Sequence, residues 1–358
     1  MERAERDLFE RAVDRAVTGR SGAALDRELV ELGWSDALAD DPEAAVSVLF
    51  SRLGRANASS AALAQVVSAG LGLDPRQVGP ALLPALGSSA PPARLEGAPP
   101  PGAAATAQID ALSLGPLDAD GSDRLVVAAA DGLISVAAAD LAVEPVAGLD
   151  PGMGLYRVTA DRVRFQPIRT GRAGPGPETG PARPGPETGA ARPGPETGPA
   201  GPGPETGSWA EAVAWSRRAV GHELAGAARA MVELARGHAL ERVQFDRPIA
   251  RFQAVRHRLA EALVAVEGAD SLLAAAWEDP SAELSAAAKA VAGRAGRTAA
   301  RHAQQVLAGI GFTAEHPFHR YLRRVIVLDQ LFGTSRTLTS QLGDQILEAG
   351  KVPGLLPL

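Results

Sequence analysis

The first hundred residues space their apolar side chains as amphipathic helices do. Apolar positions recur every three or four residues in three stripes, each fit to cover one helix face. The stripes are Leu8, Phe9, Val13 and Val17; Leu25, Leu29 and Leu32; and Val46, Leu49, Phe50 and Leu53. A Pro-Pro-Pro-Gly cluster at residues 99–102 then interrupts the pattern. We therefore predict an N-terminal helical domain over residues 1–105.

After about Thr106 the period of the pattern shortens to that of β-strands. Short segments rich in Val and Leu are separated by Asp-Gly, Ala-Gly and Asp-Pro-Gly turns. They are Arg124–Ala129, Leu133–Val136, Ala142–Val146, Leu155–Thr159 and Val163–Gln166. We expect a reduced, mostly antiparallel β domain over residues 106–168. A core this small is expected to rely on packing against the helical parts.

Residues 169–207 are of a different kind. The hexapeptide PGPETG begins at Pro175, Pro184, Pro193 and Pro202, which is a nine-residue period. It contains no large apolar side chain, so burial cannot offset the entropy lost on ordering. The segment is interpreted as an extended, partly polyproline linker. A proline-motif docking site is the alternative interpretation.

Helical periodicity returns from Ser208 to the end of the chain. Four amphipathic stripes are present: Val220 to Leu234, Val255 to Leu273, Leu284 to Ala295, and Leu338 to Ile346. Helices of this length and number predict an antiparallel four-helix bundle over residues 208–358. The expected fold class is mainly α with a small β domain.

Composition narrows the class of protein. The chain has no cysteine, which excludes disulfides, thiolate metal sites and cysteine nucleophiles. The net charge is −6 and no basic cluster stands out, so a nucleic-acid partner is not expected. The N-terminus is charged and amphipathic, and no apolar run reaches the length of a membrane span. A cytoplasmic protein without a membrane span is the expectation.

Two corners of the predicted bundle carry candidate binding residues. Arg242 and Gln244 stand where the first long helix should end, and an Arg and an amide there suit a pyrophosphate. The alternative is a surface Arg favoured by the helix dipole. Gln305, Gly309 and Gly311 close the third helix, either for close backbone approach or as a simple cap.

The two histidines His316 and His319 are spaced three apart and are interpreted as a structural pair. A metal site would need a carboxylate pattern nearby, and none is present in the sequence. Neither a nucleotide-binding nor a hydrolase motif appears in a fitting context.

Several motifs in register resemble the C-terminal domain of acyl-CoA dehydrogenases. They are RVQF at residues 242–245, FQAVRH at 252–257, QVLAGIGFTAEHPFHRYLRR at 305–324, and LFGT at 331–334. ELGW at 31–34 resembles part of that family's N-terminal domain, and RLVVAA and LDP resemble its β domain. The resemblance implies the acyl-CoA dehydrogenase-like arrangement of three domains.

What the resemblance implies chemically is FAD-dependent α,β-dehydrogenation of an acyl-CoA thioester, in fatty acid or lipid metabolism. A carboxylate removes the α proton while the β hydrogen leaves as hydride to the flavin. Family members place certain C-terminal residues against the FAD of a neighbouring subunit. Carried over onto this chain, the cofactor-binding residues are Arg242, Gln244, Phe245, Gln305, Gly309 and Thr334.

The chain departs from the family pattern where the catalytic base is expected. The common base is the Glu of Y-E-G-T, and Phe332 stands in its place. Other members place the base early in the first bundle helix, near Ser216, which is no carboxylate. Asp329, Glu211 and Glu223 are the nearest carboxylates, and the sequence assigns the base to none of them.

Two further departures concern the flavin. The segment that approaches the flavin ring, with its T-E-P and Trp-Ile-Thr motifs, has no counterpart between Leu95 and Asp123. The usual Gly after Phe245 is replaced by Asp246, which would repel a pyrophosphate unless it points away.

Three interpretations follow from this pattern. The sequence favours a subunit that completes the FAD site of a partner chain, in a homo- or hetero-oligomer. The alternatives are a self-sufficient acyl-CoA dehydrogenase with a relocated base and a flavin-dependent oxidoreductase of another type on the same fold. The acyl group is not identifiable, because no residue of the chain can be assigned to the substrate pocket.

Overall fold

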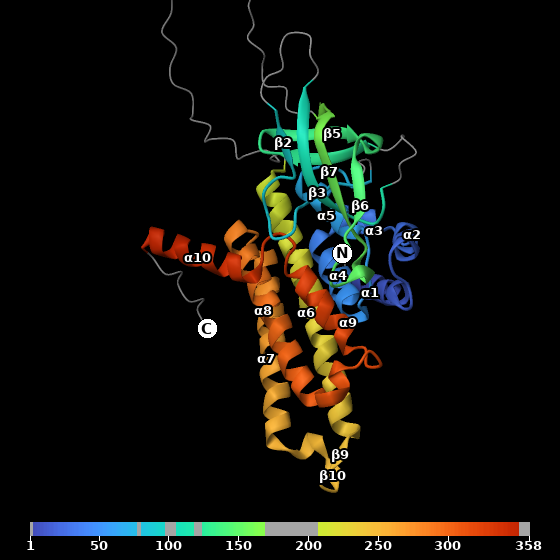
Figure 1. The fold of residues 1–358 in the computed structure, drawn as a ribbon, viewed down its shortest axis with the longest axis vertical. Coiled ribbons are helices and arrows are strands. Elements are labelled where there is room, and N and C mark those ends of the chain that lie inside the picture. The colour runs from blue at the N-terminus through green and yellow to red at the C-terminus, as the bar shows by residue number, and fades with distance from the viewer. Residues whose placement is uncertain (1–2, 77–79, 97–104, 118–123, 169–206, 351–358) are drawn as a thin grey trace, which may run out of the picture.

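The structure is a computed structural model that describes residues 3–76, 80–96, 105–117, 124–168 and 207–350. The repeats predicted as a linker lie outside these residues. Within the described ranges, five helices come first, then a sheet, then five more helices (Figure 1). The mainly α fold class with a small β domain is thereby confirmed. No helix in the described part is long and apolar enough to cross a membrane.

The N-terminal helices follow the apolar stripes. They are α1 (Arg3–Val17), α2 (Ala23–Glu31), α3 (Trp34–Asp40), α4 (Pro42–Ala56) and α5 (Ala62–Gly70). Helix α4 begins where the Asp41 carboxylate accepts a hydrogen bond from Ala44 N at 3.0 Å, with Pro42 at the first helical position. The three apolar stripes did not predict α3 or α5 as separate helices.

The described strands form an eight-stranded sheet in which β2 and β4 pair in parallel and the other pairs are antiparallel. They are β1 (Leu83–Pro84), β2 (Ala93–Leu95), β3 (Thr106–Leu114), β4 (Arg124–Ala129), β5 (Gly132–Ala137), β6 (Ala142–Pro145), β7 (Leu155–Arg164) and β8 (Gln166–Ile168). The prediction of two strands within 155–166 was wrong, because β7 pairs along the whole of β3. Strand β3 itself was missed.

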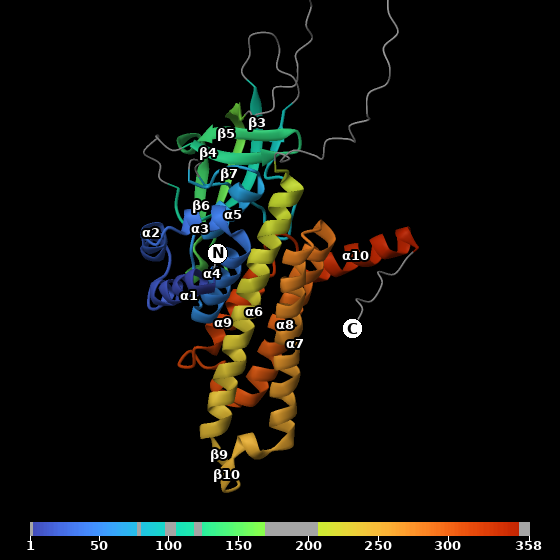
Figure 2. The same ribbon diagram turned by 180° about the vertical axis from the view of Figure 1, so that it is seen from behind.

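Three long helices run antiparallel through the C-terminal part: α6 (Trp209–Glu241), α7 (Gln253–Glu278) and α8 (Ala282–Leu307) (Figures 1 and 2). Side-chain oxygens cap two of them. Ser208 accepts a hydrogen bond from Glu211 N at 3.2 Å, and Ser281 accepts one from Leu284 N at 3.3 Å.

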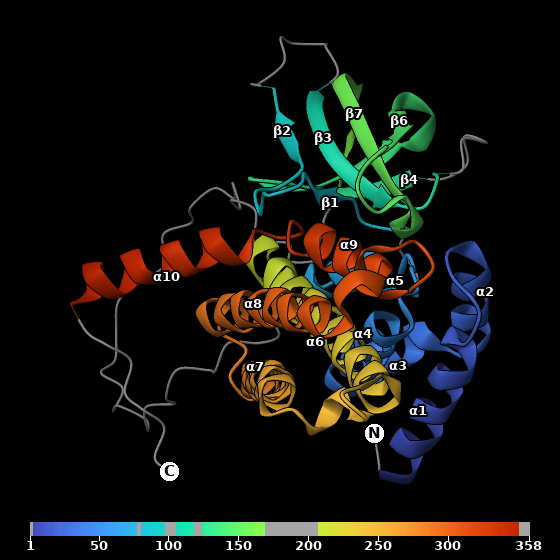
Figure 3. The same ribbon diagram turned by 60° about the horizontal axis from the view of Figure 1, so that its bottom comes forward.

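The fourth helix of this bundle is α9 (Phe318–Leu328), which packs on α6 and α8. The stripe at Leu338 and Leu342 does form a helix, α10 (Ser335–Ala349), as predicted. However, α10 contacts α8 only near its start and then projects from the body (Figure 3). Its apolar side chains Leu338 and Leu342 pack on Ala286 and Ala290 in a small separate cluster.

One large apolar core joins the N-terminal helices to the bundle, and the sheet has a second core of its own. Small residues let α4 and α6 cross closely. A Cβ built on Gly54 would lie 2.0 Å from the carbonyl oxygen of Glu223, and one on Gly226 would lie 2.3 Å from that of Ser51. The two helices therefore hold a fixed crossing.

Buried polar contacts join all three parts at Arg324 of α9. Its guanidinium lies 2.5 Å from Asp150 in the β part, 2.6 Å from Ala58 O in the N-terminal part, and 3.6 Å from Glu223 of α6. The buried guanidinium of Arg324 and its two carboxylate partners thus connect the N-terminal helices, the sheet and the bundle.

Candidate functional site

The far end of the bundle carries a short hairpin between α6 and α7. Strands β9 (Val243–Gln244) and β10 (Arg247–Pro248) pair antiparallel around Phe245 and Asp246, whose φ angles are 52° and 58°. Positive φ at both central residues is the mark of a tight hairpin turn. Aspartate tolerates this conformation better than most residues. Asp246, which stands where the family pattern has a glycine, can therefore adopt the positive φ that the turn requires.

Phe245 stands at the tip of the hairpin, 86% exposed. Its ring meets Phe252 edge-on, with centroids 6.0 Å apart and planes at 78°. The guanidinium of Arg247 covers the Phe252 ring at 4.4 Å. Phe252 is thus covered by two side chains, while most of the Phe245 surface faces outward.

Arg242 and Gln244 flank the same turn with exposed side chains. The backbone of Arg242 caps α6, since its N–H donates to His238 O and its carbonyl accepts from Ile249 N. Among the residues that the structure describes, the Gln244 side chain donates only to the neighbouring Val243 carbonyl, at 2.8 Å. The backbone is therefore fixed here, while both side chains are turned to the outside.

Gln305 and Gly309 lie at the same end of the molecule, because α8 runs antiparallel to α7 and ends where α7 begins (Figure 1). Both are exposed. After Leu307 the chain turns into the short 3-10 helix η4 (Ala308–Phe312), which leaves Phe312 74% exposed. A Cβ on Gly309 would meet nothing within 4 Å, so the space over this glycine is open.

Thr334 lies at the opposite end, where its side chain caps α10 by accepting from Thr337 N at 3.0 Å. Five of the six predicted cofactor-binding residues therefore share one end of the bundle, and Thr334 stands apart from them. The loop before Thr334 is where the family pattern places a base.

Phe332 is fully buried in that loop, with a φ of 54°. Ser216, at the other expected base position, is also buried and donates its hydroxyl to Ala212 O at 2.7 Å, within its own helix. A phenyl ring accepts no proton, and the serine hydroxyl is engaged. Neither position supplies a base.

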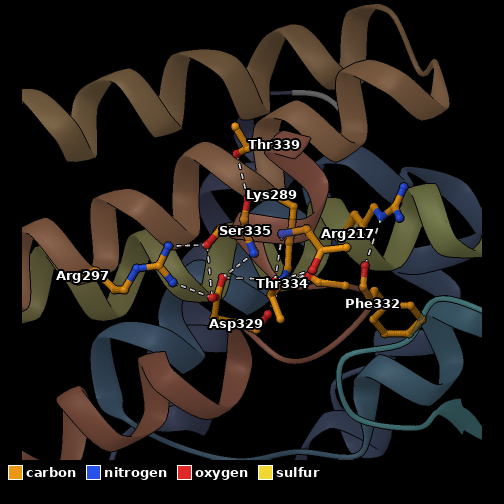
Figure 4. Close-up of polar contacts among 10 residues, drawn as sticks. Arg217, Lys289, Arg297, Asp329, Phe332, Thr334, Ser335 and Thr339 are labelled. Atoms are coloured by element: carbon orange, nitrogen blue, oxygen red, sulfur yellow. Dashed lines mark hydrogen bonds and ion pairs between the residues drawn. The ribbon is translucent and has the colours of Figure 1, made fainter. Parts of the chain in front are cut away.

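Asp329 is buried and its carboxylate is fully engaged (Figure 4). It accepts from Arg297 Nη1 at 2.6 Å, from Ser335 N at 3.1 Å and from Ser335 Oγ at 3.1 Å. These donors favour the charged carboxylate and join the end of α9 to the start of α10. Asp329 is thus a structural anion.

The other two carboxylates considered as bases lie elsewhere. Glu223 is buried at the Arg324 junction, where desolvation raises its pKa to about 7 against the lowering effect of Arg324. Glu211 is exposed in the first turn of α6, where its backbone N–H is capped by Ser208. Neither is bonded to the loop around Phe332 in the described part of the chain, so the structure assigns the base to neither.

Lys289 of α8 is fully buried beneath the same loop. Its Nζ donates to Asp329 O at 2.7 Å and to Gly333 O, and lies 3.8 Å from the Asp329 carboxylate. Burial lowers its pKa to about 8. The ammonium thereby holds the loop from below through backbone carbonyls.

Arg217 of α6 holds the loop from the other side. Its Nε donates to Phe332 O at 3.2 Å, and Figure 4 shows its guanidinium on the side of the loop opposite to Arg297. Burial lowers the pKa of Arg217. The carbonyls of Phe332 and Gly333 thus accept from two different cations.

Neither of these two cations was predicted from the sequence. Lys289 had a usable signal, since it is one of two lysines in the chain and interrupts an alanine-rich helical segment. Arg217 had none, because its contact with Phe332 spans 115 residues.

His316 and His319 bond to the backbone. The first accepts from Phe318 N at 3.2 Å, and the second lies 2.8 Å from His316 O. Both rings are therefore engaged with the backbone around the start of α9.

Comparison with known proteins finds a family similarity in the C-terminal part of the chain. Residues 208–347 match the family model for acyl-CoA dehydrogenase, C-terminal domain. Acyl-CoA dehydrogenase IpdE2 of Mycobacterium tuberculosis is 35% identical over 127 residues, which are 36% of this chain and 40% of that protein. The match thus spans less than half of the relative.

Solved structures share the fold across nearly the whole chain. The ChsE4–ChsE5 complex from Mycobacterium tuberculosis aligns with a TM-score of 0.70 at 20% identity, over 99% of both chains. A glutaryl-CoA dehydrogenase from Mycobacterium smegmatis in complex with FADH2 aligns at 0.67 and 14%, over 98% of this chain and 96% of that chain. Residues 208–347 are thus similar to the C-terminal domain of acyl-CoA dehydrogenases, and the chain shares the fold of these solved structures.

Proposed function

We propose that this chain is a subunit that completes the FAD site of a partner acyl-CoA dehydrogenase-like chain. The observation that carries the proposal is the outward presentation of Arg242, Phe245 and Gly309 at one end of the bundle. A phenyl ring that is 86% exposed on a tight turn is costly in water, and cover by a neighbour removes that cost.

The residues at this end fit a dinucleotide held by a neighbour. Arg242 offers a guanidinium for a pyrophosphate, Gln244 and Gln305 offer amides, and Phe245 offers a ring face. The open space over Gly309 permits close approach of a ligand to the backbone. FAD, when bound, supplies the acceptor for a hydride from the acyl-CoA.

The interior of the chain supports an assisting role. Phe332 and Ser216 fill the two base positions with groups that take no proton, and Asp329 is bound by Arg297 and Ser335. Proton removal from the acyl-CoA is therefore assigned to the partner. The ChsE4–ChsE5 structure, which has the same fold, is itself a complex of two different chains.

The lone chain should carry little flavin in its absorbance spectrum. Mixed with a full-length partner that has a base, it should retain FAD and oxidise an acyl-CoA. Stoichiometric FAD and acyl-CoA oxidation by the lone chain would reject the assisting role in favour of a self-sufficient enzyme.

The variant Arg242→Ala should weaken FAD retention in the complex by at least about tenfold, the scale expected for a charge-assisted contact. Arg27→Ala removes an equally exposed arginine from the N-terminal helices and should leave retention unchanged. Equal retention by both variants would show that Arg242 does not contact the cofactor.

A further inference from the structure

The loop between α9 and α10 is surrounded by more positive than negative charge. Lys289, Arg297 and Arg217 each donate to a group between Asp329 and Ser335. Asp329 is the one carboxylate that these contacts include. Three cations thus face one anion.

The single anion does not serve all three cations. Asp329 binds Arg297 directly and lies 3.8 Å from the Lys289 ammonium. Arg217 stands on the other side of the loop (Figure 4). Within the described ranges, no carboxylate lies in ion-pair distance of Arg217, and its one hydrogen bond is to the Phe332 carbonyl. Its charge is left without a counterion.

The guanidinium of Arg217 also retains unused donors. Its Nε is engaged with Phe332 O, which leaves the edge formed by the two terminal nitrogens. That edge lies next to Gly333, where even an added Cβ would stay 3.9 Å from Nη2. Gly333 has a φ of 94°, which favours glycine, so the position is kept free of a side chain.

We propose that Arg217 and the Phe332–Gly333 turn form a binding site for a carboxylate group of a small-molecule ligand. A carboxylate matches the two parallel N–H groups of a guanidinium edge, and one negative charge balances the one uncompensated cation. The site lies on this chain's own loop and does not depend on the bundle-end residues or on a flavin.

A half-buried cation without a counterion is unfavourable for the folded chain. A ligand carboxylate that pairs with Arg217 would remove this cost. Phe332 stands at the position where the family pattern has a catalytic carboxylate, and Arg217 lies beside it. At this position the proposed site would therefore bind a carboxylate of the ligand, whereas the family pattern has a carboxylate of the protein.

The test is thermal unfolding of the full chain at constant ionic strength, with succinate as the probe and uncharged succinamide as its control. Succinate should raise the melting temperature of the wild type saturably. Arg217→Gln should weaken this response at least tenfold. Arg236→Gln, which changes an exposed arginine of the same helix, should respond as the wild type does.

An undiminished succinate response in Arg217→Gln, or an equal response to succinamide, would overturn the proposal. A saturable response to phosphate as strong as that to succinate would overturn the choice of a carboxylate. Should Arg217→Gln not fold, Arg217→Lys decides. This variant keeps the positive charge but lacks the two parallel N–H groups of the guanidinium, and it must bind succinate at least several-fold more weakly than the wild type.

Discussion

The guanidinium of Arg324 lies 2.5 Å from a carboxylate oxygen of Asp150, although 174 residues separate them along the chain. Arg324 is 1% exposed. The same guanidinium reaches Ala58 O at 2.6 Å, so the helical bundle, the sheet and the N-terminal helices meet on one side chain.

Removing this cation should destabilise the whole fold. Arg324→Met leaves Asp150 and Glu223 buried without a counterion, which costs about 3–5 kcal/mol. Urea unfolding curves would measure the loss. Arg323→Met alters the exposed neighbour and should stay within about 0.5 kcal/mol of the wild type. Equal midpoints for the two variants would show that the junction carries no stability.

Glu223 should make stability depend on pH. Its pKa is raised from 4.5 to about 7, chiefly by desolvation, so the folded state holds this proton more tightly than the unfolded chain does. That contribution is full below pH 4.5 and is lost as the pH rises through about 7. Glu223→Gln cannot titrate and should gain roughly 3 kcal/mol over the wild type between about pH 4.5 and 8. Parallel pH profiles of unfolding for the two proteins would contradict this.

Lys289 should control the order of the loop from Gln330 to Ser335. Lys289→Met orphans the carbonyls of Asp329 and Gly333 and is expected to cost about 2–4 kcal/mol. Hydrogen exchange of the loop amides should accelerate along with the loss of stability. Arg294→Met, an exposed change on the same helix, serves as the control. Unchanged exchange in Lys289→Met would mean that the loop is held by its other contacts.

Two glycine replacements should move stability in opposite directions. Gly54→Ala drives a Cβ to 2.0 Å from a backbone oxygen of α6, and overpacking of this kind costs at least about 2 kcal/mol. Gly237 lies on α6 at a position where an added Cβ would meet nothing within 4 Å. Gly237→Ala should therefore raise the free energy of unfolding by about 0.5–1 kcal/mol, as alanine does in a helix interior. Melting temperatures that shift in the same direction would refute the close crossing of α4 and α6.

The sequence pattern predicted local elements well where one face is buried. Val13 and Val17 are buried as their stripe required, and β4 begins and ends at the predicted residues. It failed for β7, because the polar run around Asp161 looks like a turn until β3 is seen to pair along its whole length. The pattern predicted which face of α10 is buried. It did not predict the direction in which α10 leaves the bundle, because that direction depends on a short contact with α8.

The residues of the candidate site were likewise predicted where local sequence identifies them and missed where their contacts are long-range. Arg242, Phe245 and Gly309 were found because they stand near helix ends within recognisable motifs. Arg217 and Lys289 were not, since their partners lie 115 and 44 residues away and periodicity carries no information on such contacts. The direct role of the six predicted residues at FAD stays a prediction.

Helix α10 begins where Thr334 caps it and Ser335 is bound to Asp329, as described above. In addition, the Thr339 hydroxyl donates to Ser335 O at 2.7 Å. These bonds fix the direction in which α10 leaves the bundle. Its free end is therefore carried at a set angle and reach from the bundle. A neighbouring molecule that contacts α10 would therefore meet it in the direction that the bonds at Ser335 set.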